Sequence, residues 1–449
     1  GGEFTFRTMS ESLIYAANRI PEIADDIVNV DSAMKWGFAR KLGPFEAWDG
    51  IGVSESVAKM KGAGYEIPGW VQEMLDSGKD SFYTKKNGRP CFYDVASKSY
   101  EEVPLKPGII LLPSVKEREK LVDGNIGASL VDIGDGVACL EFHTKMNAIG
   151  EDITAMIHKS ADIVSRDFDG LVIANHGTNF SAGANLVMVL FAAQEEEWDD
   201  LGFAIKSFQD AMMKLKHLDK PVVAAPAGMA LAGGCEVCLA ADRIRYAAES
   251  YMGLVEVGVG LIPAGGGCKE LLIRNTEHLF EVEKGGLYPK QIELMPFVAR
   301  AFEAIALAKV STSGPEAAKL GYLRPTDKMT VNRDYLIEDA KNTVLAMNME
   351  GYTPPKPLEE IRVPGENTLA MMKLAIWTLH EQGYATDHDV TVSTKVAHVL
   401  CGGNVLADTK VSEQYLLDLE LEAFLSLCGD PNTQARIQHM LNTGKPLRN

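Results

Sequence analysis

The sequence predicts an α/β core set between two mainly helical regions. From Ala128 to about Asp242, short apolar runs rich in β-branched residues alternate with amphipathic segments, as strands and helices do in an α/β domain. From about Glu11 to Pro113, and again after about Leu271, apolar residues recur at spacings of three and four, which favours helices. The 449 residues are 46% hydrophobic, which is apolar material for about two to four domains.

Breaks in these patterns divide the chain. Residues 1–10 lack the basic and apolar regions of a signal peptide and look more like an artificial junction than native structure. We expect a helical domain over residues 11–113 and then a linker over residues 114–128, because prolines and glycines interrupt the helical pattern there. The α/β domain is expected over residues 129–350, and a C-terminal helical region over residues 366–449 follows a proline-rich break.

Charge and cysteine content narrow the class of protein. Acidic residues (62) outnumber Lys plus Arg (44), which gives a formal net charge of −18. A negative surface repels phosphate backbones and anionic lipids, so we expect neither a nucleic-acid partner nor a membrane partner. The seven cysteines are odd in number and scattered, unlike a disulfide framework, which favours a reducing, cytoplasmic compartment.

Several strands can be placed in the α/β region. The run LVDIGDGVACLEF predicts a hairpin with its turn at residues 134–136, and LVIA and VVAA are continuous apolar runs typical of strands buried on both faces. The stretch from Val222 to Ala241 reaches transmembrane length, but it contains Pro226, three glycines and Glu236. A strand, a turn and a helix explain it better.

The segment from Leu231 to Ala241 carries the first chemical signal. It predicts a helix entered through a small-residue loop, whose first backbone N–H groups lack intrahelical acceptors and attract negative charge. Gly233 and Gly234 let a ligand carbonyl approach these N–H groups, and Glu236 follows on the same helix face. The alternative is that the glycines serve close packing and that Glu236 is an ordinary surface charge.

Two further segments could complete a site. Glu256, in GLVEVGVGL, lies between apolar neighbours, so burial would raise its pKa towards that of a useful proton donor. The small residues Ala182, Gly183 and Ala184, in GTNFSAGANL, let the backbone approach a ligand and supply a second N–H donor. Taken alone, Glu256 could equally be exposed on an alternating strand, and the loop needs no function.

Together these segments resemble the enoyl-CoA hydratase/isomerase (crotonase) superfamily, from about Ser129 to Thr326. Four motifs agree with the family in order and spacing: HTKMNAI, NFSAGANL, KPVVAAPAGMALAGGCEVCLAADRIR and LVEVGVGLIPAGGG. The resemblance implies a ββα spiral core in which the backbone N–H groups of Ala184 and Gly233 hold a thioester oxygen. Hydratases of the family keep glutamates at the positions of Glu236 and Glu256, and this sequence has both.

The resemblance also implies a mechanism. Glu236 would activate a water that attacks C3 of a trans-2-enoyl-CoA, while Glu256 would deliver a proton to C2 on the same face. Lys145 is expected to contact the CoA phosphates or adenine rim, although a solvated lysine explains it nearly as well. The sequence departs from the family at Asn185, where aspartate is usual, and at Ala264, where glycine is common and whose N–H is expected to help hold the water.

The N-terminal flank carries a second resemblance. Residues 30–52, VDSAMKWGFARKLGPFEAWDGIG, resemble the C-terminal helical domain of 3-hydroxyacyl-CoA dehydrogenases. This order is that of a bifunctional β-oxidation protein whose NAD-binding domain comes earlier in the full-length protein. The sequence has no G-x-G-x-x-G after an opening strand, so we expect no NAD binding, no other cofactor and no dehydrogenase activity from this chain alone.

Competing functions have weaker signals. Cys235 and Cys238 form a C-x-x-C without a second pair, which does not predict a metal site. Ser181 lacks the leading glycine of a nucleophile elbow, although a histidine elsewhere could serve it. The open alternatives to a hydratase are a double-bond isomerase and a catalytically silent CoA-binding or assembly module of a β-oxidation complex. The family implies self-association.

Overall fold

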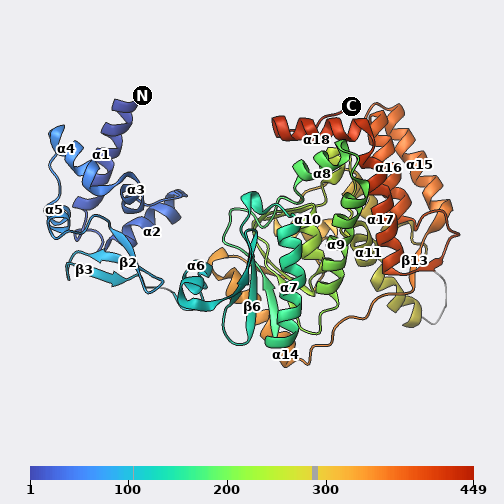
Figure 1. Ribbon diagram of the computed structural model, residues 1–449, viewed down its shortest axis with the longest axis horizontal. Helices are drawn as coiled ribbons and strands as arrows, with labels where there is room; N and C mark the ends of the chain where they lie inside the picture. The colour runs from blue at the N-terminus through green and yellow to red at the C-terminus, as the bar shows by residue number, and fades with distance from the viewer. Residues whose placement is uncertain (105, 286–291) are drawn as a thin grey trace. The chain divides into compact units, whose positions relative to one another are not determined.

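The computed structural model describes residues 1–104, 106–285 and 292–449. The chain folds into two compact units (Figure 1). The first unit comprises Gly1–Pro107 and Pro113–Glu119, and the second comprises Gly108–Leu112 and Lys120–Asn449.

The first unit joins five helices to a small sheet. The helices are α1 (Gly2–Asn18), α2 (Ile27–Phe38), α3 (Pro44–Ile51), α4 (Val53–Gly62) and α5 (Gly69–Asp76). An antiparallel sheet follows, in the order β1 (Tyr83–Lys86), β2 (Arg89–Asp94) and β3 (Ser99–Glu102). Its core is aromatic: the ring of Phe82 lies 5.1 Å from that of Phe45 and 5.3 Å from that of Trp48.

This unit departs from the sequence expectation in three places. The helix α1 begins at Gly2 and buries Ser10, so residues 2–10 are helical, whereas they were expected to lie outside the native fold. The sheet occupies a region where the sequence analysis saw only breaks in a helical pattern. The segment expected to be a linker is structured: it contains the end of α6 (Leu112–Val115), the helical turn η1 (Lys116–Lys120) and strand β4 (Leu121–Gly124).

The second unit is built on a seven-stranded sheet. Its strand order is β12-β10-β8-β7-β6-β5-β4, antiparallel from β4 to β6 and parallel from β6 to β12. The bounds are β5 (Ala128–Asp132), β6 (Val137–Phe142), β7 (Gly170–Ile173), β8 (Val222–Ala224), β10 (Arg243–Ala247) and β12 (Lys328–Thr330). The predicted hairpin is confirmed by the pairing of β5 with β6 across residues 133–136.

The chain winds through this sheet as a spiral of strand, strand and helix. After β8 it enters β9 (Gly228–Leu231) and then α10 (Gly233–Ala240), and after β10 it enters β11 (Ser250–Gly253), the 3-10 turn η3 (Glu256–Val259) and then α11 (Gly267–Gly285). The strands β9 and β11 form a second, parallel sheet. Single parallel β-bridges continue this pattern in earlier segments of the chain. Ser181 pairs with Ala230, and Ile149 pairs with Ala184. The α/β core that the sequence predicts is therefore present.

Helices cover this core and complete it. They are α7 (Glu151–Asp167), α8 (Leu186–Gln194), α9 (Trp198–Lys216), α12 (Met295–Ala306), α13 (Gly314–Leu320) and α14 (Leu336–Met349), then α15 (Gly365–Glu381), α16 (Asp387–Leu400), α17 (Glu413–Cys428) and α18 (Pro431–Thr443). Two short strands, β13 (Ile361–Val363) and β14 (Thr409–Val411), pair near the last helices.

The C-terminal helices belong to the same hydrophobic core as the sheet. Helix α17 contacts α9 and α11, and α18 contacts α8 and η3 (Figure 1, where α17 and α18 are red and α8 and α9 are green). Buried Leu416 and Ile437 lie in one continuous cluster with Val237 and Leu271. Across the described ranges, no helix is long and apolar enough to cross a membrane.

Candidate active site

Two small-residue loops meet at the N-terminal end of α10. A Cβ atom added to Gly183 would lie 2.6 Å from the Cβ of Ala232, and one added to Gly234 would lie 2.6 Å from the Cβ of Ser181. Both distances are too short for a side chain, so glycine is required for the loops to approach this closely. The close approach brings the segments around Ala184 and Gly233 together.

The two predicted oxyanion donors, the N–H groups of Ala184 and Gly233, have no acceptor among the described residues. The β-bridge between Ile149 and Ala184 does not use the Ala184 N–H. Its two hydrogen bonds run from Ile149 N–H to Gly183 O (2.8 Å) and from Asn185 N–H to Ile149 O (3.1 Å). Gly233 is the first residue of α10, where an N–H has no intrahelical acceptor. Within the described part of the chain, neither of these two N–H groups donates a hydrogen bond. Two free donors at one place can stabilise a developing negative charge.

Ala232, the N-cap of α10, is held in a strained conformation. Its φ of 49° and ψ of −126° lie in a region that residues with a Cβ rarely adopt. Its N–H donates to Gly253 O (2.9 Å), and its own carbonyl accepts from Cys235 N–H (2.8 Å) and Glu236 N–H (3.0 Å). These bonds fix the peptide that precedes Gly233 and hence the direction of the Gly233 N–H.

Glu236 lies in the first turns of α10 and is 4% exposed. One carboxylate oxygen, Oε1, accepts hydrogen bonds from Gly265 N–H and Gly267 N–H, both at 2.8 Å. Burial raises the pKa of this carboxyl to about 7, while the N–H groups of Gly267 and Gly265 oppose the shift. Glu236 is therefore a buried carboxyl whose pKa suits a general base near neutral pH.

Glu256 begins η3 and has a different environment. Its Oε2 atom is buried, and among the described residues it has no hydrogen-bond partner. Burial is the main cause that raises the pKa of Glu256 well above its ordinary value, and the charge of Glu236 raises it further. An uncharged carboxyl with a free oxygen is suited to donate a proton.

The other residues predicted to contact CoA or substrate lie in different environments. Lys145 is exposed in the 3-10 turn η2 (Lys145–Asn147). The Ala182 N–H already donates to Met146 O (3.1 Å), so it is not free for a ligand. Ala264 is buried, and its carbonyl accepts from the side chain of Gln209. Asn185 keeps a local role, because its side chain caps α8 by accepting from Val187 N–H (3.2 Å).

Sequence reasoning missed a third buried carboxyl, Glu420 on α17. It is 0% exposed and accepts from Gly266 N–H (2.8 Å) and Lys269 N–H (2.7 Å), in the same turn that binds Glu236. A signal was available: Glu420 stands four residues after Leu416 and four before Phe424, on the buried face of an apolar helix. An acidic residue at such a position needs buried partners.

The serine and cysteine alternatives gain no support from the geometry. Ser181 is fully buried, and its hydroxyl donates to Asn147 O (2.7 Å) and accepts from Gly183 N–H, so it braces the loop. Cys235 and Cys238 are buried free thiols, and burial raises the pKa of both. In the described ranges, no group of three or more His, Cys, Asp or Glu residues is arranged to hold a metal ion.

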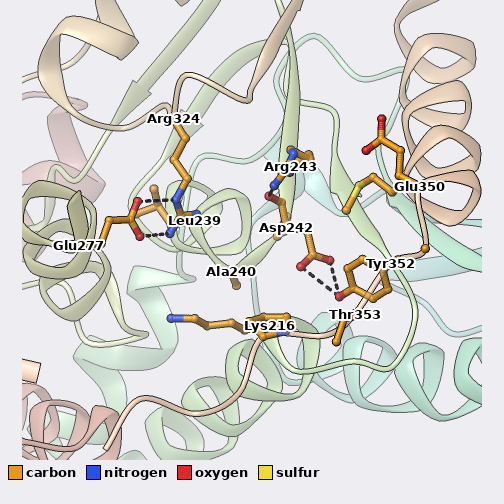
Figure 2. A pocket seen from close by; sticks show the side chains of 14 residues that line it. Lys216, Leu239, Ala240, Asp242, Arg243, Glu277, Arg324, Glu350, Tyr352 and Thr353 are labelled. Atoms are coloured by element: carbon orange, nitrogen blue, oxygen red, sulfur yellow. Dashed lines mark hydrogen bonds and ion pairs between the residues drawn. The ribbon is translucent and has the colours of Figure 1, made fainter. Parts of the chain in front are cut away.

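A cavity of about 450 Å³ lies at the opposite end of α10 from Gly233 (Figure 2). Two carboxyl groups in its lining are already paired: Asp242 accepts from the Tyr352 hydroxyl (3.0 Å), and Glu277 accepts from Arg324 Nε (3.0 Å). Burial raises the pKa of Asp242 to about 6, so a raised pKa does not by itself distinguish the two ends of α10. The N–H groups of Ala184 and Gly233 without acceptors in the described residues lie at the other end, together with Glu236. We therefore place the candidate active site at the N-terminal end of α10.

Comparisons with known proteins identify the family of the central domain. The family described as Enoyl-CoA hydratase/isomerase matches residues 132–278, which contain Ala184, Gly233, Glu236 and Glu256. A "Probable 3-hydroxyacyl-CoA dehydrogenase" of Bacillus subtilis (strain 168) is 47% identical over 448 residues, which cover 100% of this chain and 55% of that protein. A "Putative fatty acid oxidation complex trifunctional enzyme" of Rickettsia felis is 26% identical over 437 residues, covering 97% of this chain and 53% of that protein.

The chain thus spans about half the length of these curated relatives. Among solved structures, an enoyl-CoA hydratase from Bacillus halodurans aligns with a TM-score of 0.47 and 16% identity, over 69% of this chain and 98% of that one. Residues 132–278 thus form a domain of the enoyl-CoA hydratase/isomerase (crotonase) superfamily.

Proposed function

We propose that this chain is an enoyl-CoA hydratase that adds water to trans-2-enoyl-CoA and gives 3-hydroxyacyl-CoA. The observation that carries the proposal is the contrast between Glu236 and Glu256. One carboxyl is held by two N–H donors, and the other has a buried oxygen without a partner in the described structure. Two carboxyls with different environments beside two free N–H groups suit a reaction that needs a base, an acid and an oxyanion site.

In the proposed step, the Glu236 carboxylate takes a proton from water as the water oxygen bonds to C3. The electron pair of the C2–C3 double bond moves towards the thioester, whose oxygen accepts from Ala184 N–H and Gly233 N–H. Glu256 then gives its proton to C2. Glu236 ends protonated and Glu256 ends ionised, and exchange with solvent restores both.

The relatives support a setting in fatty-acid oxidation. Proteins named as fatty acid oxidation complex enzymes and as a probable 3-hydroxyacyl-CoA dehydrogenase align along nearly the whole chain. We propose that the first unit is the helical C-terminal-type domain of such a dehydrogenase, and that the second unit supplies the hydratase step. The Lys145 ammonium is proposed to contact the CoA phosphates.

Two alternatives differ in what they require. A double-bond isomerase moves one proton between C2 and C4, for which one carboxyl suffices, so two buried carboxyls favour hydration. A silent binding module has no need to keep either carboxyl buried at a cost in stability.

The test is to give the purified chain crotonyl-CoA and, separately, a trans-3-enoyl-CoA, without nucleotide, and to identify the products by mass. Hydration predicts a product heavier by one water from crotonyl-CoA. Conversion of the 3-enoyl to the 2-enoyl thioester, with no hydration of crotonyl-CoA, would identify an isomerase. Tight thioester binding without turnover of either would identify the silent module.

A further inference from the structure

Two carboxyl groups share the turn that leads into α11. Gly265 N–H and Gly267 N–H donate to Glu236 Oε1, both at 2.8 Å. Gly266 N–H donates to Glu420 Oε2 (2.8 Å), and Lys269 N–H donates to Glu420 Oε1 (2.7 Å). Successive N–H groups therefore point to opposite sides, with Glu236 on one side and Glu420 on the other.

The local sequence of this turn, residues 265–267, does not by itself fix the backbone conformation. Gly266 has a φ of +109°, and a Cβ atom added to Gly265 or Gly267 would lie 2.6 Å or 2.9 Å from a Glu236 oxygen. Glycine is needed at these positions so that the backbone can touch the carboxylate. Three successive glycines are also the most flexible backbone available, so the turn needs an external support.

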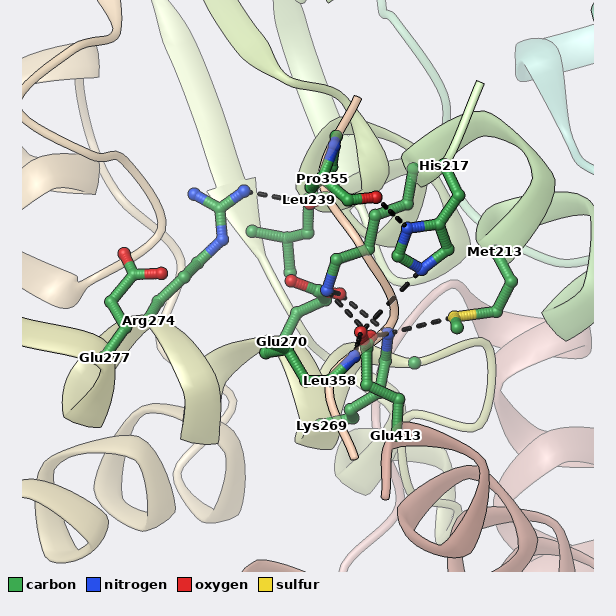
Figure 3. Close-up of polar contacts among 12 residues, drawn as sticks. Met213, His217, Leu239, Lys269, Glu270, Arg274, Glu277, Pro355, Leu358 and Glu413 are labelled. Carbon is green, nitrogen blue, oxygen red and sulfur yellow. Dashed lines mark hydrogen bonds and ion pairs between the residues drawn. The ribbon is translucent and has the colours of Figure 1, made fainter. Parts of the chain in front are cut away.

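Helix α17 provides that support, and two anchors hold it in the turns that precede Glu420. At the helix start, Glu413 Oε2 accepts from Lys269 Nζ and Lys216 Nζ, both at 2.8 Å, beside Glu270 (Figure 3). Closer to Glu420, the buried amide of Gln209 donates to Leu417 O (2.9 Å) and to Ala264 O (2.8 Å). The amide ties α17 to the residue that precedes the glycine turn.

We propose that Glu420 is a positioning residue of the active site, whose carboxyl group holds the Gly266–Lys269 backbone so that Gly265 and Gly267 aim their N–H groups at Glu236. The inference rests on the hydratase function proposed above. It makes the C-terminal helix α17 part of the active site. Glu420 acts through backbone and Glu236 and does not contact substrate.

The nearest charged groups fit this role. Burial, and then the charge of Glu236 on α10, raise the pKa of Glu420 well above its ordinary value, and Glu420 in turn raises the pKa of Glu256 on η3. The N–H donors and Lys269 of α11 favour the ionised form of Glu420 but do not outweigh burial. Glutamine at position 420 would keep only one acceptor oxygen, so either Gly266 N–H or Lys269 N–H would face an amide N–H instead. The turn would then shift, and the donors to Glu236 would shift with it.

The test measures crotonyl-CoA hydration by Glu420→Gln, with Glu422→Gln as the matched control. Glu422 is exposed on the same helix, so its variant makes the same Glu-to-Gln replacement without the buried contacts. We expect Glu420→Gln to lower kcat by about 10- to 100-fold with KM within about twofold, because a small misplacement of a catalytic group is costly. The control should match wild type.

A double-mutant cycle separates positioning from general structural damage. If Glu420 acts through Glu236, adding Glu420→Gln to Glu236→Gln should cause little further loss of kcat. Losses that multiply in the double variant, or a folded Glu420→Gln variant with wild-type kcat, would overturn the inference. If Glu420→Gln fails to fold, Glu420→Asp, which keeps the charge on a shorter side chain, takes its place with the same expected non-additivity. A wild-type chain that hydrates no enoyl-CoA would overturn the proposed function itself, and this inference with it.

Discussion

Two buried clusters of charged side chains lie next to each other around α11, and they handle burial in opposite ways. The carboxyl cluster consists of Glu236, Glu256 and Glu420, and its hydrogen bonds come from backbone N–H groups. The lysine cluster consists of Lys216, Lys269, Glu270 and Glu413, in which each ammonium contacts both carboxylates (Figure 3).

The pKa values follow this difference. Burial disfavours the charged form in both clusters, and in the carboxyl cluster it prevails, raising the pKa of Glu236 to about 7 and that of Glu256 well above its ordinary value. In the lysine cluster burial is outweighed by Lys216 and Lys269, and the pKa of Glu270 lies well below its ordinary value. In the lysine cluster the positive and negative charges balance, and the cluster serves as a structural anchor. In the carboxyl cluster no opposite charge compensates for burial, so the carboxyl groups have raised pKa values suited to proton transfer.

The largest expected effect is on catalysis by the carboxyl cluster. Glu236→Gln and Glu256→Gln should each lower kcat/KM for crotonyl-CoA by about 10²- to 10⁴-fold, since each removes an acid–base group but keeps its shape. The loss of the conjugated thioester absorbance measures the rate. The exposed Glu249→Gln is the control, and thioester binding should survive in all three. Near-wild-type rates in either active-site variant would remove that glutamate from the mechanism.

The second-largest effect is expected on the free energy of unfolding, when a member of the lysine cluster is replaced. Lys269→Met leaves Glu270 and Glu413 with Lys216 as their shared ammonium, and breaking a buried ion pair typically costs about 3 to 5 kcal/mol of unfolding free energy. Denaturant unfolding measures this cost. Lys373→Met, at an exposed position on α15, should change it by less than about 0.5 kcal/mol. Equal stability of both variants would show that the cluster anchors nothing.

The contrast between the clusters also predicts that Glu236→Gln stabilises the fold relative to wild type, by an amount that depends on pH. The pKa of Glu236 rises from 4.5 to about 7 on folding, so the native chain binds the proton more tightly and this glutamate destabilises the fold as pH rises through that window. Glu236→Gln keeps an acceptor for Gly265 and Gly267 but carries no charge. It should be more stable than wild type by on the order of 2 kcal/mol at about pH 8, and the gain should vanish near about pH 4.5. An identical difference at both pH values would contradict the assignment.

The smallest effect concerns the backbone beside the oxyanion donor. Ala232→Gly should relieve the strain at a φ of 49° and raise the unfolding free energy by about 1 kcal/mol, with little change in kcat. Thermal unfolding and the hydration assay check both parts. A loss of stability would mean that the neighbouring hydrogen bonds do not impose this conformation.

Local patterns predicted the elements that carry the chemistry. The apolar runs predicted β7 and β8, and the small-residue loop before Glu236 predicted the start of α10. The family motifs predicted Ala184 and Gly233 as oxyanion donors; the structure brings their loops close together, and their role as donors stays a prediction. These features arise within short stretches of sequence, where periodicity and small residues leave clear signals. The catalytic roles of the glutamates remain predictions.

Other parts of the fold escaped the sequence analysis for identifiable reasons. The hairpin of β1 and β2 turns at Asn87 and Gly88, whose φ values of 52° and 70° are those of a tight hairpin turn. The Asn-Gly pair was a usable signal. The burial of Glu420 left a signal in the spacing of its helix, but its partners were beyond reach. Gly266 and Lys269 precede it by more than 150 residues, and spacing alone does not show which helix packs against which turn.

The most direct test of the central claim is the pH dependence of kcat/KM for crotonyl-CoA hydration by the wild-type chain. An ionised Glu236 and a protonated Glu256 predict a bell, with an acidic limb near pH 7 as Glu236 becomes protonated and an alkaline limb at higher pH as Glu256 ionises. A flat profile from about pH 5 to about pH 9, or a rate that rises as pH falls through 7, would contradict the assignment of base and acid.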